Sequence, residues 1–326
     1  MASTEYRTRT PDRDVLHQLV SDHFETFRTR VAARGEGHGL PQFVEREFRE
    51  FLTCGSLAGG FARFRCAGCG ADRLVAFSCK GRGFCPSCGG RRMTDRAAHL
   101  VDRVFPRVPA RQWVLTLPPR LRYLVAWDHA RCRAVVAVYL RAVGGWLRAR
   151  ARRRGITGGR FGAVAIVQRF GSALNLNVHV HALVPDGVFA ADTAGRVGFR
   201  RDRSGAPRDL PALLGLIARR IERLLARRGL ALDAAGDDAP DAWAEEMPML
   251  AGIAAASVQG VAALGPRAGA PTRRWGDRID LPEPPGASAW HAHVAGFDLH
   301  AAIVVPAKAR VRLERLCRYA LRPAVG

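Results

Sequence analysis

The sequence has no long apolar run, few acidic residues and almost no lysine. None of its apolar stretches approaches the eighteen uninterrupted residues that a membrane span requires. The N-terminal segment Met1–Arg7 lacks the apolar core of a secretory signal. We therefore expect a cytoplasmic protein, in which the eight cysteines bind metal rather than form disulfides.

Acidic residues are too few to balance the basic ones. The chain carries 51 lysine and arginine residues against 29 aspartate and glutamate residues, a formal net charge of +22. Only Lys80 and Lys308 are lysines. The planar arginine fork suits phosphate oxygens better than the point charge of lysine does. A GC-rich genome would explain arginine in place of lysine but not the excess over acids, so the charge predicts a polyanion partner, most simply nucleic acid.

Six of the cysteines lie between residues 54 and 88. Two C-x-x-C pairs, Cys66-Ala67-Gly68-Cys69 and Cys85-Pro86-Ser87-Cys88, are separated by fifteen residues, a spacing typical of a four-cysteine zinc site. A segment this short cannot bury enough apolar surface alone, so the metal would supply its folding energy. We predict that Cys66, Cys69, Cys85 and Cys88 bind one structural Zn²⁺. Cys54 and Cys79 are left over, with Cys79 as the second choice of ligand.

Arginines and phenylalanines alternate around these cysteines. Cationic and aromatic side chains together suit phosphate contacts and base stacking. We predict that Arg82, Arg91 and Arg92 contact DNA, and the alternative is a solvated charged face over a small core. The interleaved aromatic residues are Phe61, Phe64, Phe77 and Phe84.

The rest of the chain predicts an α+β fold. A small four-cysteine, zinc-ribbon-like module precedes an antiparallel β-sheet backed by helices, and the order β-α-β-β supports this class. We place the domain boundary between residues 105 and 106, with an insertion or linker around 230–288. Strands are expected at 111–117, 161–170, 175–184 and 294–305, and helices at 13–32, 41–53, 93–104, 120–153, 211–229 and 310–322.

Two histidines share one face of the strand at 175–184. Alternate side chains of a strand point the same way, so His179 and His181 are positioned to grip one divalent ion. Gln168, on a neighbouring strand, has an amide oxygen that would complete a three-ligand site. The alternative is a pair of histidines on a half-exposed strand. A second pair, His291-Ala292-His293, lies outside any β-rich apolar run and is interpreted as a surface coincidence, with His300 structural.

The four tyrosines differ in their surroundings. Tyr6 lies in the terminus, and Tyr123 and Tyr139 lie on the apolar pattern of a helix. Tyr319 is flanked by arginines, a setting that holds a phosphodiester and lowers the pKa of a phenol. Because tyrosine can form covalent intermediates, we predict Tyr319 as a nucleophile, against the alternative of a helix tyrosine at a basic surface. The flanking arginines are Arg315, Arg318 and Arg322, and we predict DNA contacts for Arg318 and Arg322.

Three blocks of the sequence together resemble the rolling-circle transposases of the IS91 and common-region type. The blocks are Cys66–Cys88 with its Phe-Cys-Pro-Ser-Cys end, the Asn-Val-His-Val-His-Ala-Leu-Val strand, and Leu-Cys-Arg-Tyr-Ala-Leu-Arg-Pro. These proteins belong to the HUH (His-hydrophobe-His) endonuclease superfamily, with a ferredoxin/RRM-like sheet. Arg315 stands where some relatives carry a second tyrosine, so the chain resembles the single-tyrosine kind. It stops at Gly326, where relatives continue, and we expect a truncated C-terminus.

The resemblance implies an activity and its partners. It implies a catalytic Mg²⁺ or Mn²⁺ on His179 and His181, and nicking of single-stranded DNA by Tyr319 to leave a 5′-phosphotyrosine and a free 3′-OH. The zinc module would help to recognise the single-stranded or hairpin ends of a mobile element in a nucleoid-associated bacterial protein. The alternatives are a non-catalytic or decayed zinc-ribbon DNA-binding protein and a plasmid replication-initiator nuclease.

Overall fold

The chain forms two compact units. The computed structural model describes residues 11, 14–34, 39–81, 83–171, 174–205, 207–230, 248–259, 261–272 and 289–324. The first unit comprises residues 1–95, 241–251 and 322–326, and the second comprises residues 96–240 and 252–321. The units therefore divide after residue 95 rather than after residue 105. The reason is that Val101 and Phe105 are buried in the same cluster as Leu313 and Cys317 of the second unit.

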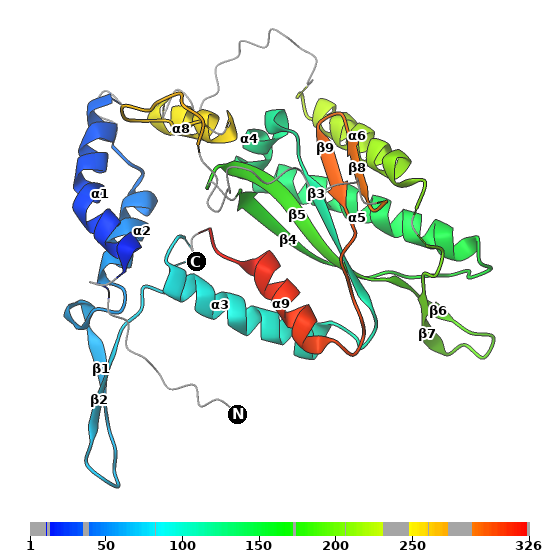
Figure 1. Cartoon of the computed structure of the whole chain (residues 1–326), viewed down its shortest axis with the longest axis horizontal. Helices are drawn as coiled ribbons and strands as arrows, with labels where there is room; N and C mark the ends of the chain where they lie inside the picture. Colours follow the sequence, from blue (N-terminus) through cyan, green and yellow to red (C-terminus); the bar gives the residue numbers. More distant parts are fainter. Residues whose placement is uncertain are drawn as a thin grey trace, which may run out of the picture. The chain divides into compact units, whose positions relative to one another are not determined.

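The first unit combines two helices with a β-hairpin and the start of a third helix. Its core is aromatic: the Phe24 and Phe48 rings stack at 4.7 Å, and the Phe84 ring lies 4.8 Å from Phe48 and 4.9 Å from Phe51. This packing explains the apolar spacing in the predicted helices. The elements are α1 (Val15–Arg34), α2 (Gln42–Thr53), η2 (Leu57–Gly59), β1 (Phe61–Arg65), β2 (Asp72–Ala76) and α3 (Pro86–His99), and all but the short η2 are labelled in Figure 1.

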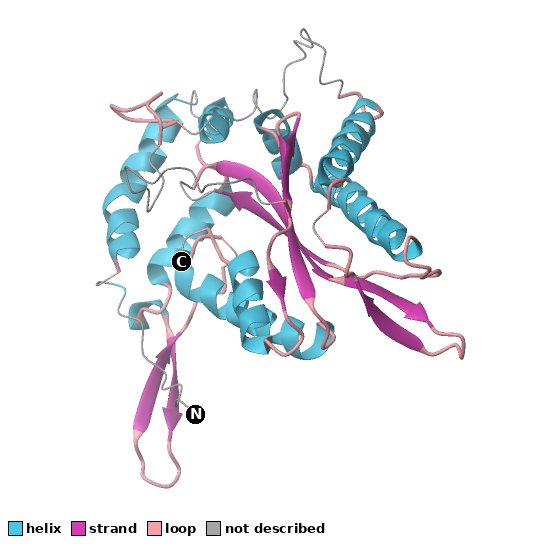
Figure 2. Cartoon of the chain, turned by 45° about the vertical axis from the view of Figure 1, so that its right-hand side comes forward, coloured by secondary structure: helices cyan, strands magenta, loops and turns pink. Residues whose placement is uncertain are grey.

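The second unit is built on an antiparallel sheet, which confirms the predicted fold class. Its strand order is β4-β5-β3-β9-β8, and β10 also pairs with β3. A separate hairpin is formed by β6 and β7. The strands, drawn in magenta in Figure 2, are β3 (Ala110–Thr116), β4 (Val164–Phe170), β5 (Leu176–Pro185), β6 (Gly187–Ala191), β7 (Val197–Arg201), β8 (His291–Val294), β9 (Phe297–His300) and β10 (Val304–Val305).

Both faces of this sheet are covered, and β5 shows how. Val178, Val180 and Ala182 are buried in one core with α5 and α6. Leu183 points the opposite way and packs with Leu313 of α9, as the two-residue period of a strand requires. The helices of this unit are α4 (Pro119–Trp127), α5 (His129–Arg152), α6 (Leu210–Ala226) and α9 (Arg310–Leu321), with α8 (Pro248–Gln259) shared between the units and a π-helical turn, η3 (Leu100–Val104), after α3.

Two expected elements are divided in the structure. The helix predicted at 120–153 breaks at Asp128, whose carboxylate accepts the N–H groups of Ala130 and Arg131 and so begins α5. The strand predicted at 294–305 is three short strands. Its first turn is made by Ala295 and Gly296, at φ 51° and 79°. The proposed insertion at 230–288 contains α8, while 231–247, 260 and 273–288 lie outside the described residues.

Candidate zinc module and candidate active site

Four cysteine sulfurs of the first unit converge. The Sγ atoms of Cys54, Cys79, Cys85 and Cys88 all lie within 4.8 Å of one another. The Cys79–Cys88 distance is 3.5 Å, and the Cys54 sulfur lies 3.7 Å from both Cys85 and Cys88. A tetrahedral zinc with Zn–S bonds of about 2.3 Å has sulfur–sulfur edges of about 3.8 Å. The four sulfurs therefore fit one zinc ion.

This set corrects the predicted one in two members. Cys66 and Cys69 are exposed in the turn of the β1–β2 hairpin, beyond the last cross-strand pair, Arg65 with Asp72. Their places are taken by Cys54 at the end of α2 and by Cys79 just after β2. C-x-x-C spacing identifies a pair of ligands that are near in sequence. It could not show that two isolated cysteines 25 residues apart complete the tetrahedron.

Backbone pairing brings Cys54 to Cys79. The Gly55 N–H donates to the Phe77 carbonyl at 2.9 Å, and the Phe77 N–H donates to the Gly60 carbonyl at 2.9 Å. These bonds hold the end of α2 beside the end of β2. The Cys79 N–H donates to the Cys54 sulfur at 3.4 Å. The β1–β2 hairpin lies between them in sequence, and its turn contains Cys66 and Cys69.

The cysteine cluster perturbs its own thiols. A hydrogen bond from the Cys85 thiol, ahead of weaker ones from Cys79 and Cys88, lowers the pKa of Cys54 to about 4. Burial raises the pKa of Cys79 to about 12, and the hydrogen bond to Cys54 raises the pKa of Cys85. One thiolate among buried thiols is the arrangement that a divalent cation would neutralise.

The basic residues predicted to contact DNA beside this cluster have different surroundings. Arg91 is exposed, whereas Arg92 donates to the Lys80 carbonyl at 2.9 Å. Arg82 lies outside the described residues. Phe64 is 60% exposed on the hairpin and Phe77 is 56% exposed just after β2. The DNA contacts remain predictions.

The second unit brings Gln168 against the histidine pair. Gln168 of β4 and His179 of β5 are cross-strand partners. The Gln168 Oε1 atom lies 2.9 Å from His179 Nε2 and 3.3 Å from His181 Nε2. Adjacent ligands of an octahedral ion with bonds of about 2.1 Å are about 3 Å apart. Both distances from the Gln168 oxygen match such an edge, and the structure brings together Gln168, His179 and His181, the three ligands that the sequence predicts.

The opposite nitrogen of each imidazole is also engaged. His179 Nδ1–H donates to the Asn177 carbonyl at 2.8 Å, and His181 Nδ1 lies 2.8 Å from the side-chain nitrogen of Gln112. A neutral imidazole has one proton, so the His179 Nε2 lone pair faces the Gln168 oxygen. Either a second ring proton or a metal ion would join these two acceptors. Gln112 on β3 contacts the histidine pair and was missed by the sequence reasoning, although one amide within an apolar strand is the signal that marks it.

Tyr319 adjoins this site through α9. Its ring meets the His181 ring edge-on, with centroids 5.8 Å apart. The Gln168 side-chain N–H₂ group donates to the carbonyls of Tyr319 at 3.1 Å and of Ala320 at 2.8 Å. The Tyr319 side chain is 49% exposed, so the phenol is reachable. One glutamine therefore connects the histidines to the tyrosine's helix.

The other two tyrosines that the structure describes have different surroundings. Tyr139 is fully buried in the α5 core, where burial raises its pKa. Tyr123 packs half-buried against Trp127 on α4. Tyr6 lies outside the described residues. Among the described tyrosines, Tyr319 is the one in ring contact with the histidine pair.

A groove with a mainly apolar lining and two arginines opens beside Tyr319. It has a volume of about 320 Å³ and includes Gln112 and two exposed arginines, Arg312 and Arg315. Arg318, predicted to contact DNA, instead donates to Glu314 Oε1 through Nε at 3.1 Å and through a terminal nitrogen at 2.5 Å. The structure thus places Arg312, about two helical turns before Tyr319, with Arg315 at the groove.

The second His-x-His pair, which the sequence placed outside any β-rich apolar run, lies on a short strand. His291 and His293 belong to β8, opposite His300 and Asp298 of β9. His291 Nε2 lies 2.8 Å from Asp298 Oδ2, and His293 Nδ1 lies 3.6 Å from it. Burial, followed by the neighbouring His291, lowers the pKa of His300. Among the histidines, cysteines, aspartates and glutamates that the structure describes, Cys54, Cys79, Cys85 and Cys88 form the one group of three or more whose ligand atoms all lie within 4.8 Å of one another.

Comparison with known families matches two segments of the chain. A family described as "Transposase zinc-binding domain" matches residues 19–117, and one described as "Putative transposase" matches residues 162–326, about half of the chain. Searches of curated proteins and of solved structures found no match. No helix in the described part of the chain is long and apolar enough to cross a membrane. The chain therefore belongs to the IS91-type transposases that carry an N-terminal zinc-binding domain.

Proposed function

We propose that the protein nicks and transfers single-stranded DNA at the ends of a mobile element by a rolling-circle route. The observation that carries the proposal is the position of Gln168. Its amide oxygen faces both histidine Nε2 atoms, and its amide nitrogen binds the backbone at Tyr319. A metal-binding face and a nucleophile are thereby held together.

His179, His181 and Gln168 would hold a divalent Mg²⁺ or Mn²⁺ ion. Bound there, the ion would act as a Lewis acid that polarises the scissile phosphate. His179 keeps its Nε2 lone pair available because its Nδ1–H donates to the Asn177 carbonyl. His181 Nδ1 lies 2.8 Å from the Gln112 amide, and when Nε2 binds the ion the amide would turn its oxygen to accept the proton on Nδ1. His181 is buried, which excludes water from that side of the site.

Tyr319 supplies the nucleophile in this proposal. Its phenolic oxygen forms a bond to phosphorus while the bond from phosphorus to the 3′ oxygen breaks. The phenol loses its proton and the departing 3′ oxygen gains one, leaving a 5′-phosphotyrosine and a free 3′-OH. Arg312 and Arg315 line the adjoining groove, where their guanidinium groups would hold the flanking phosphates. The retained phosphodiester energy permits rejoining to a target strand.

The first unit would recognise the element end. Its cysteine cluster would hold Zn²⁺ and stabilise the unit, because a hairpin and two helices bury little apolar surface alone. Arg82, Arg91 and Arg92 remain the proposed DNA contacts here, with Arg318 and Arg322 in the C-terminal segment. Single-stranded or hairpin ends are the proposed ligands.

Replacing His179 by alanine tests the metal site. The change should reduce Mg²⁺-dependent nicking of a labelled single-stranded element end to below about one hundredth of the wild-type rate. The two ligands that remain, His181 and Gln168, are too few to hold the ion. DNA binding in a gel-shift assay should change little. His291→Ala is the matched control, since it also removes one histidine from a His-x-His strand. Equal loss in both variants, or wild-type nicking by His179→Ala, would refute the assignment. Tight binding without nicking by the wild type would favour a DNA-binding role alone.

Gln112 is expected to act as a positioning residue for His181. Gln112→Leu should raise the half-saturating Mn²⁺ concentration about tenfold. The substitution removes the hydrogen-bond partner of His181 Nδ1, which fixes the orientation of the imidazole ring. Mn²⁺ binding measured by electron paramagnetic resonance gives this value without an activity assay. Gln112→Glu can accept a hydrogen bond from Nδ1–H and should restore most of the affinity. If the leucine variant binds Mn²⁺ as the wild type does, the hydrogen bond has no such role.

A further inference from the structure

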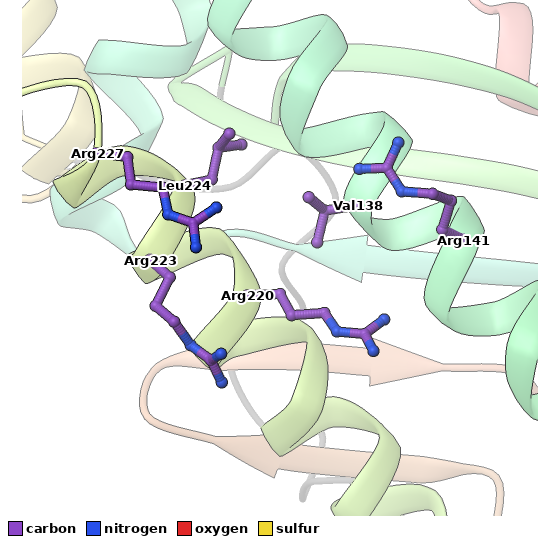
Figure 3. A pocket seen from close by; sticks show the side chains of 6 residues that line it. All are labelled: Val138, Arg141, Arg220, Arg223, Leu224 and Arg227. Carbon is purple, nitrogen blue, oxygen red and sulfur yellow. The ribbon is translucent and has the colours of Figure 1, made fainter.

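Four arginines line a groove between α5 and α6. The groove has a volume of about 290 Å³ and an apolar floor of Val138 and Leu224. Figure 3 shows one arginine projecting from α5 and three from α6 and its C-terminal end, with the two apolar residues among them. We call this set the arginine groove, and its basic members are Arg141, Arg220, Arg223 and Arg227.

The charge of the arginine groove is not neutralised within the described part of the chain. All four arginines are exposed, and none of them forms an ion pair with an acidic side chain that the structure describes. Neighbouring arginines differ: Arg150 pairs with Asp202 at 2.7 Å, and Arg120 pairs with Glu222 of α6 at 3.2 Å. Like charges gathered around one hollow repel one another, so the groove favours an anionic occupant.

A structural role for the charges accounts for only part of the set. Basic residues near a helix C-terminus stabilise the helix through its dipole, and Arg223 and Arg227 lie in the last turn of α6 and at its end. Arg220 lies earlier in α6, and Arg141 lies in the middle of α5. Neither gains from that dipole. Their convergence on the same hollow therefore points to a ligand.

The arginine groove belongs to the opposite side of the sheet from the histidine pair. Val180 and Ala182 of β5 pack in the core with α5 and α6, whereas His179 and His181 point to the other face, towards α9. A phosphate bound beside Tyr319 is thus not the phosphate bound in the groove. The groove serves another stretch of DNA.

The lining defines the chemistry of the occupant. Guanidinium forks bind phosphate oxygens in pairs. No aromatic side chain lines the groove, so it offers no platform on which unpaired bases stack. The three α6 arginines extend over about 10 Å at 1.5 Å per residue, long enough for more than one phosphate.

We propose that the arginine groove binds the phosphate backbone of duplex DNA that flanks the nicked strand, without reading its sequence. This inference rests on the proposed function, because that function makes DNA the polyanion. It adds a second contact, which would keep the protein on the element or its target while the strand is cut. Binding there depends on salt through the release of counterions.

The test is the salt dependence of duplex binding by the full-length protein. A random-sequence duplex is titrated at several NaCl concentrations with the wild type and with the triple variant Arg220→Gln, Arg223→Gln, Arg227→Gln. In the groove variant, the negative slope of the log association constant against log salt concentration should become shallower by about 2 to 3 units. Its affinity for the duplex should fall at least tenfold at moderate salt. A triple control, Arg107→Gln, Arg152→Gln, Arg160→Gln, removes the same charge from exposed sites that do not line the groove. In this control variant the slope should become shallower by less than about 1 unit.

Two readouts separate this inference from the proposed function. Nicking of a short single-stranded oligonucleotide reports the histidine–tyrosine site and should be unchanged in the groove variant. Equal slopes for the groove and control variants, with circular dichroism showing both folded, would overturn the groove assignment even if nicking is normal. A wild type that binds the duplex with a groove-dependent slope but never nicks would refute the proposed function and leave the groove intact.

Discussion

Tyr319→Phe is expected to eliminate the covalent protein–DNA adduct completely. The substitution removes one oxygen, the atom that would bond to phosphorus, and leaves the ring that contacts His181. The oligonucleotide carries its label at the 3′ end, because the fragment downstream of the nick becomes linked through its 5′ phosphate. A labelled band at protein mass on a denaturing gel, in the presence of Mg²⁺, measures the reaction.

The control for this variant is another tyrosine. Tyr123→Phe removes the phenol oxygen of a half-buried side chain on α4 and should leave the adduct at the wild-type level. Binding of the uncut oligonucleotide should be the same in both variants, since neither change removes charge. An adduct that persists in Tyr319→Phe and disappears in Tyr123→Phe would move the nucleophile to α4. An adduct in both variants would exclude these two residues from the chemistry.

Cys54→Ser is expected to release the zinc ion and unfold the first unit. Structural zinc supplies about 10–16 kcal/mol in small modules, comparable to or larger than the 5–15 kcal/mol stability of a typical domain. A serine oxygen is a poor replacement for one of four thiolates around this ion. We expect one equivalent of zinc in the wild type and none in this variant, measured by plasma mass spectrometry. A chelator should reproduce the variant's circular dichroism and melting profile.

The matched control is Cys66→Ser, which makes the same chemical change in the exposed turn of the hairpin. It should retain the zinc and melt as the wild type does. Cys79→Ser should behave like Cys54→Ser, and Cys69→Ser like Cys66→Ser. The opposite pattern, with zinc lost from the hairpin variants and kept without Cys54, would restore the ligand set that C-x-x-C spacing predicts.

Local patterns determined much of the second unit. The two-residue period of β5 assigned His179 and His181 to one face, because side-chain direction depends only on the strand itself. The antiparallel sheet followed from the order of elements and was confirmed. Gln168 could be suggested as a third ligand because residues that pair across adjacent strands point to the same face of the sheet. Gln112 was missed because nothing local indicates that β3 lies on the other side of β5 and pairs with it in register.

The sequence by itself determined that this chain is basic, carries a cysteine-rich module and presents a histidine pair on a strand. Those properties reside in composition and in short-range spacing. Only the tertiary structure decided which cysteines converge, because the hydrogen bonds of Gly55 and Phe77 place Cys54 beside Cys79 and leave Cys66 at the hairpin tip. It also decided that α5 and α6 pack together and gather their arginines into one groove. Contacts between segments far apart in sequence depend on packing and register, which no local pattern encodes.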